Sequence, residues 1–186
     1  IMKKQYLICI VSFLIISSVE VSSAKSWPPK SEWNMHLNGQ WKFKFLPEKN
    51  PEPESEFMQI HFDDSQWDDI NVPSNWEMQG FETPHYFFPA KTYGLYRRTF
   101  TIPDNWHGRY TQLVFEGVSF GFECWVNGKK AGQFESAFQP FSVDITKLLK
   151  PDSINTLAVR VYKDHPATRF DCNDAWALSG IYRDVY

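Results

Sequence analysis

The chain has 186 residues, enough for one domain and too few for two of ordinary size. Hydrophobic residues make up 42% and charged residues 22%, as in ordinary globular proteins, which argues against a disordered chain. The formal net charge of −3 gives no sign of the clustered basic surface that nucleic acid or an anionic membrane would require. We therefore expect neither among the partners.

The first 24 residues have the pattern of a signal peptide. Lys3 and Lys4 are basic, residues 7–16 are apolar, and small residues follow at 22–24. An apolar run of about ten residues is too short for a bilayer, which requires roughly 20. We expect export to the periplasm or the cell exterior, and a mature chain that forms one domain over residues 25–186.

Short strands with period-two alternation dominate the rest of the chain. The strands predicted in this way lie near residues 41–45, 96–102, 113–115, 120–126, 131–134 and 156–161. Residues 47–56 predict an exposed loop, 63–65 a turn, and Asn127-Gly128 a hairpin between two strands. No helical periodicity occurs outside the leader, so we predict an all-β fold of two packed sheets.

Two cysteines remain once residues 1–24 are removed. An oxidising compartment permits a disulfide between Cys124 and Cys172. However, Cys124 alternates with Phe122 and Val126 along a predicted strand, which favours a buried thiol. The aromatic content is 17%, and we expect most of these rings in the core and the rest as platforms for sugar rings.

The most informative segment is residues 171–186, in which an acidic loop leads into a final strand. Metal-binding and phosphate-binding motifs such as CxxC, HExxH and GxGxxG are absent from the sequence. A loop carboxylate beside Trp176 can accept hydrogen bonds from sugar hydroxyls or bind a hard cation. Composition alone favours a merely solvated acidic turn. In the final strand, Arg183 and Asp184 are expected to form an ion pair.

Residues 176–186, Trp-Ala-Leu-Ser-Gly-Ile-Tyr-Arg-Asp-Val-Tyr, resemble the end of the sugar-binding domain of glycoside hydrolase family 2. Further blocks follow the family's order at residues 38–43, 72–81, 96–100, 115–118, 125–128, 140–146 and 155–159. The resemblance covers nearly everything after residue 32. It implies a jelly-roll β-sandwich of the galactose-binding-domain-like type, followed in the family by an immunoglobulin-like domain and a TIM barrel.

The resemblance also implies an activity for a longer parent protein. Family members such as the β-galactosidases hydrolyse terminal β-linked sugars in carbohydrate catabolism. They use two glutamates whose carboxyl groups lie about 5 Å apart and retain the anomeric configuration. In the family both glutamates belong to the barrel. By resemblance, this chain holds no catalytic residue and is inactive alone. It shapes the pocket for a β-linked oligosaccharide or polysaccharide, in an enzyme that can be a homo-oligomer.

Asp174 matches an aspartate that, in β-galactosidases of the family, contacts the galactosyl hydroxyls and a bound sodium ion. A carboxylate suits both tasks, because it accepts from hydroxyl donors and binds hard cations. The complete enzyme would use sodium and magnesium ions, with none held by this chain alone. Trp176, His85 and Tyr86 are weaker candidates for lining the same pocket.

Other readings stay open. The family often has an acidic residue where Cys172 stands, and the stretch from Pro84 to Tyr93 is short and has no evident match for an asparagine of the galactose pocket. This leaves room for a β-glucuronidase or β-mannosidase, and for a free-standing carbohydrate-binding module or a purely structural sandwich. Because the sequence ends within a predicted strand, we expect an N-terminal portion of a longer protein.

Overall fold

The computed structural model describes residues 31–47, 55–86, 91–166, 168–171 and 174–186. Residues Ser31–Tyr186 form one compact unit. The expected signal peptide, most of the loop expected at 47–56, and Cys172 lie outside the described residues. Within the described part of the chain, no helix has the length and apolar character that crossing a membrane requires.

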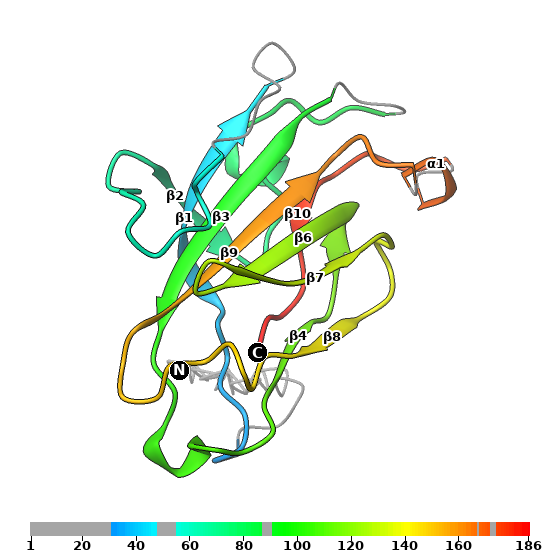
Figure 1. Cartoon of the computed structure of the whole chain (residues 1–186). Helices are drawn as coiled ribbons and strands as arrows, with labels where there is room; N and C mark the ends of the chain where they lie inside the picture. The colour runs from blue at the N-terminus through cyan, green and yellow to red at the C-terminus, as the bar shows by residue number, and fades with distance from the viewer. Residues whose placement is uncertain (1–30, 48–54, 87–90, 167, 172–173) are drawn as a thin grey trace, which may run out of the picture. The chain divides into compact units, whose positions relative to one another are not determined.

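A six-stranded antiparallel sheet forms the larger layer (Figure 1). In spatial order its strands are β2 (Asp68–Val72), β1 (Gly39–Leu46), β3 (Tyr93–Phe100), β9 (Asn155–Tyr162), β6 (Gly121–Val126) and β7 (Lys129–Phe134). The Asn127-Gly128 hairpin joins β6 to β7 as predicted, with both residues at positive φ, 53° and 80°.

Shorter strand pairs form the second layer. They are β4 (Gln112–Phe115) with β8 (Phe141–Asp144), and β5 (Val118–Ser119) with β10 (Gly180–Ile181). The last residues extend this layer, because the backbone N–H groups of Val114 and Tyr186 donate to each other's carbonyl groups. The helices are short: η1 (Glu77–Gln79), η2 (Asp104–Trp106) and α1 (Thr168–Asp171). The fold is the predicted all-β jelly-roll sandwich.

The main core lies between the two layers. Its larger members alternate along the strands with residues of the opposite face: Trp41 and Phe43 of β1, Tyr96 of β3, Phe122, Cys124 and Val126 of β6, and Leu157, Val159 and Val161 of β9. The free thiol of Cys124 is buried, as predicted. Phe120, the first residue of the strand predicted at 120–126, does not join this core. β6 begins only at Gly121, and Phe120 packs in a separate cluster with Ala137 and Ala177.

The outer face of the larger sheet is also covered. Phe57 and Trp67, from the segment before β2, pack there against Leu95, Trp125 and Ala158. Strands β3 and β9 are therefore buried on both faces, although their sequences alternate as if one face were in water. The sequences of β3 and β9 alone do not indicate that a distant segment packs on their outer face.

Two expectations about chain ends and turns have different outcomes. The turn at 63–65 is confirmed by a hydrogen bond of 3.0 Å from the Ser65 N–H to Asp63 Oδ1. The prediction of an ion pair between Arg183 and Asp184 is wrong. Asp184 instead accepts a hydrogen bond of 2.8 Å from Asn38 Nδ2, and the Arg183 guanidinium lies over the Tyr182 ring.

Candidate functional site

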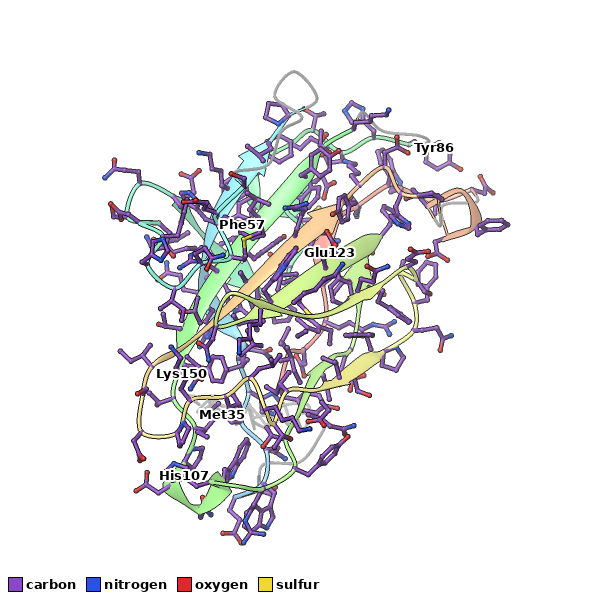
Figure 2. All side chains as sticks on the ribbon, in the orientation of Figure 1. Met35, Phe57, Tyr86, His107, Glu123 and Lys150 are labelled. Carbon is purple, nitrogen blue, oxygen red and sulfur yellow. The ribbon has the colours of Figure 1, made fainter. Side chains whose placement is uncertain are left out.

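Two loops meet at the end of the sandwich that carries α1. One is the acidic loop, of which residue 171 and residues 174–178 are described, and the other is the facing segment, residues 82–86. Tyr86 and Trp176 form an isolated antiparallel bridge, and the Ala177 N–H donates to the His85 carbonyl at 3.0 Å. The labelled Tyr86 lies beside α1 at this end (Figure 2). The backbone therefore brings together two segments that are far apart in the sequence.

The side chains at this junction form a small polar and aromatic group. The Tyr86 hydroxyl donates a short hydrogen bond to Asp174 Oδ1. The Tyr86 and Trp176 rings meet edge to face, with centroids 5.6 Å apart and an interplanar angle of 73°. Tyr86 is 45% exposed and Trp176 57% exposed, so both rings keep open surface. The result is a phenol at the surface that contacts a carboxylate through its hydroxyl and an indole through its ring.

Electrostatics fix the direction of the Tyr86–Asp174 hydrogen bond. The Asp174 carboxylate, by accepting this bond, raises the pKa of the Tyr86 phenol, which therefore stays a donor. Among the described residues, no group donates to the second carboxylate oxygen of Asp174. That oxygen can accept from a hydroxyl group of a ligand or bind a hard cation.

Asp171, the other carboxylate of the acidic loop that the structure describes, serves the fold. Its Oδ2 accepts a hydrogen bond of 2.7 Å from the Ala137 N–H, and the Tyr182 hydroxyl donates to the Ala137 carbonyl at 2.5 Å. The Asp171 bond anchors α1 to the segment after β7, and the Tyr182 bond fixes the same segment from the other side of Ala137. Asp174 stands at a positive φ of 57° and faces solvent, which distinguishes it from Asp171.

The four predicted site residues thus lie in two adjoining loops. The Tyr86 side chain contacts those of Asp174 and Trp176, whereas His85 contributes its backbone carbonyl. Phe87, a further aromatic of the facing segment's continuation, lies outside the described residues.

A buried ion-pair network next to these loops was not predicted. Lys163 Nζ lies 2.6 Å from Glu77 Oε1 and 2.6 Å from Glu82 Oε2, and the Lys163 side chain is 0% exposed. One signal was present in the sequence, because Lys163 continues the period-two phase of the buried Val159 and Val161. A lysine in phase with core residues predicts a buried charge with partners.

The described residues include one group of three His and Asp side chains with ligand atoms close together. Asp104, His107 and Asp152 have such atoms within 4.8 Å of one another, and all three are exposed. His107 lies at the end of the molecule opposite Tyr86 (Figure 2). Asp174 does not belong to this group, and it can supply one oxygen ligand to a cation.

The sequence matches the family model described as glycosyl hydrolases family 2, sugar binding domain, over residues 35–186. Similar curated proteins include a β-galactosidase from Psychromonas ingrahamii, 36% identical over 83% of this chain, and one from Priestia megaterium, 35% identical over 84%. The chain spans only 16% and 17% of the length of these relatives.

Solved structures of much longer chains contain the same fold. A Bacteroides uniformis β-glucuronidase superposes with a TM-score of 0.68 at 28% identity, covering 81% of this chain and 17% of that one. A β-glycosidase from Bacteroides vulgatus superposes with a TM-score of 0.65 at 31% identity, covering 82% and 19%. With the family model matched over most of its length, the chain belongs to the sugar-binding domain family of glycosyl hydrolases family 2.

Proposed function

We propose that this chain is the N-terminal portion of a β-galactosidase-like retaining glycoside hydrolase that removes terminal β-linked sugars in carbohydrate catabolism. Family membership and identities of 35–36% to proteins named β-galactosidase support this proposal. The observation that carries the role of this chain is the exposed Asp174 carboxylate, held by the Tyr86 hydroxyl beside Trp176.

In this proposal the chain binds and orients the sugar and does not cleave it. Asp174 accepts hydrogen bonds from sugar hydroxyls through its second oxygen, while Tyr86 fixes the orientation of the carboxylate. The open faces of Tyr86 and Trp176 bury the apolar side of the sugar ring. The acid/base and nucleophile pair, about 5 Å apart, belongs to a TIM barrel of the same longer protein, beyond an immunoglobulin-like domain.

Sodium fits this site in part. Asp174 offers one carboxylate oxygen, the type of ligand that hard cations prefer. A bound sodium ion would add positive charge next to the sugar hydroxyls. We assign no magnesium ligand to this chain. Residues 1–24 support the further proposal that the protein is exported to the periplasm or cell exterior.

Replacing Asp174 by asparagine in the longer protein tests the site. We expect kcat/KM on an aryl β-galactoside to fall about 10- to 100-fold, because a charged acceptor is lost, with an unchanged melting temperature. The matched control is Asp164→Asn. Asp164 is an exposed aspartate two residues after the end of β9. Full activity of Asp174→Asn would reject the pocket role and leave a structural sandwich.

A β-glucuronidase is the second candidate, because the Bacteroides uniformis β-glucuronidase superposes well on this chain. The same assay with an aryl β-glucuronide separates the two, since the preferred substrate shows the higher kcat/KM. An aryl β-mannoside extends the comparison to β-mannosidase activity. Sugar binding by the longer protein without hydrolysis of any of the three would favour a carbohydrate-binding module.

A further inference from the structure

Lys163 is the centre of a buried network with two carboxylates and one ammonium group. Its Nζ lies 2.6 Å from both Glu77 Oε1 and Glu82 Oε2, and the exposed fractions of the three side chains are 0%, 0% and 11%. Taking such charges out of water carries a large desolvation penalty for each ion. Apolar side chains would fill the same space without this cost, so stability alone does not account for the network.

The two carboxylates lead to the two loops of the candidate site. Glu77 Oε2 accepts a hydrogen bond of 2.9 Å from the Ser179 N–H, just beyond the acidic loop. Glu82 begins the facing segment that carries Tyr86, and its Oε2 also accepts from Trp76 Nε1 at 2.9 Å. One ammonium group therefore holds a carboxylate tied to each loop.

The backbone of Lys163 adds a third connection. Its N–H donates to the Thr92 carbonyl at 3.1 Å, and its carbonyl accepts from Thr168 Oγ1 at 3.0 Å. Thr168 is the first residue of α1, which leads into the acidic loop. The position of Lys163 is thus fixed by strand β9 and by its neighbours, and the residue can serve as a reference point for both loops.

We propose that Lys163 is a positioning residue that sets the acidic loop and the facing segment against each other through Glu77 and Glu82, so that the Tyr86 hydroxyl meets the Asp174 carboxylate. The part of this inference that concerns sugar binding rests on the proposed function. The part that concerns loop geometry does not, because it can be measured without a substrate.

The test uses the contact between the Tyr86 and Trp176 rings as a reporter of loop geometry. The ring centroids lie 5.6 Å apart, close enough for a nuclear Overhauser effect between ring protons. This effect is followed by NMR on the 186-residue chain with isotope-labelled aromatic residues, and Trp176→Leu assigns the cross-peak. When the loops lose their alignment, the rings separate and the cross-peak is lost.

Lys163→Met is the direct variant, but it leaves two buried carboxylates without their cation and can prevent folding. Glu82→Leu keeps the Lys163–Glu77 pair and releases the facing segment, and Glu82→Gln restores an acceptor for both Lys163 Nζ and Trp76 Nε1. We expect the Tyr86–Trp176 cross-peak to be lost in Glu82→Leu and to recover in Glu82→Gln. In the longer protein we expect a KM about tenfold higher for Glu82→Leu, with kcat nearly unchanged.

Asp69→Asn is the control, because Asp69 pairs with Lys42 between β2 and β1, and neither strand belongs to the two loops. It should leave the Tyr86–Trp176 cross-peak as in the wild type. An unchanged cross-peak in folded Glu82→Leu overturns the positioning role, whatever the kinetics show. Loss of the cross-peak with unchanged KM supports the positioning role and overturns the sugar-binding role of Asp174.

Discussion

Gly180, just beyond the acidic loop, is a position that the surrounding backbone restricts to glycine. Its φ is 126°, and a Cβ atom there would lie 2.9 Å from the Ser74 carbonyl oxygen and 3.0 Å from the Tyr96 hydroxyl. Only glycine adopts this conformation readily, and the neighbouring backbone leaves no space for a methyl group. The fold therefore requires glycine at position 180.

We predict that Gly180→Ala lowers the free energy of unfolding by about 2–4 kcal/mol, from backbone strain combined with the steric clash. Urea denaturation of the chain measures this change. Gly108→Ala serves as the control, because Gly108 also has a positive φ of 71° but meets no atom within 4 Å. It should cost about 1–2 kcal/mol, the strain alone. Equal costs for the two variants would refute the steric argument.

At the scale of elements, Arg97 of β3 fastens the segment of residues 55–67 to the outer face of the larger sheet. Its Nε lies 2.7 Å from Asp64 Oδ2, and its Nη1 donates to the carbonyl groups of Phe57 and, at 3.0 Å, Gln59. The Arg97 side chain is 4% exposed. A planar guanidinium can satisfy these acceptors together, whereas a lysine ammonium cannot reach them all.

We predict that Arg97→Lys destabilises the chain by about 2–4 kcal/mol, since it leaves buried carbonyl groups without donors. The segment 55–67 should open before the rest of the sandwich. Hydrogen exchange would show this as faster exchange in that segment than in β6 and β9. Lys42→Met removes the half-exposed pair with Asp69 and should cost less than about 1 kcal/mol. If segment 55–67 exchanges at the wild-type rate in Arg97→Lys, Arg97 does not hold this segment on the sheet.

The strands of the sandwich differ in how clearly the sequence pattern predicted them. Alternation identified β1, β6 and β9 because their inward positions carry large apolar side chains such as Trp41, Phe122 and Val159. β2 and β8 escaped prediction, since both are short and carry polar residues, and their neighbours in the sheet hold them in place. Nothing local to Arg97 indicates that a distant segment folds over it.

At the scale of the whole molecule, the candidate site depends on contacts between distant residues. Resemblance pointed to Asp174, but its hydrogen bond to Tyr86 spans 88 positions of the sequence and has no local pattern. The link from Lys163 to Glu77 spans 86 positions. Each local motif predicted a strand or a turn. The assembly of the two loops required the full set of strand pairings.

Because one main core joins both layers, we expect the described unit to unfold cooperatively, and Cys124 offers a probe of this behaviour. Cys124 lies in that core on β6, and its Sγ contacts the Gly132 carbonyl at 3.7 Å. Burial raises the pKa of the Cys124 thiol to about 12, from an ordinary 9.0. Between these values the unfolded chain releases the thiol proton and the folded chain keeps it. The contribution of Cys124 to stability therefore falls as the pH rises through this range.

We predict that iodoacetamide labels Cys124 at least about 10³-fold more slowly in the folded chain than in urea, because labelling requires global unfolding. Serine would replace Cys9 and Cys172 so that Cys124 is the only thiol of the chain. The labelling rate should follow the unfolding curve as urea increases, and a higher pH should shift the midpoint to lower urea. Labelling that is fast in the absence of urea, or independent of it, would mean that the β6–β7 hairpin opens on its own while the rest of the sandwich stays folded.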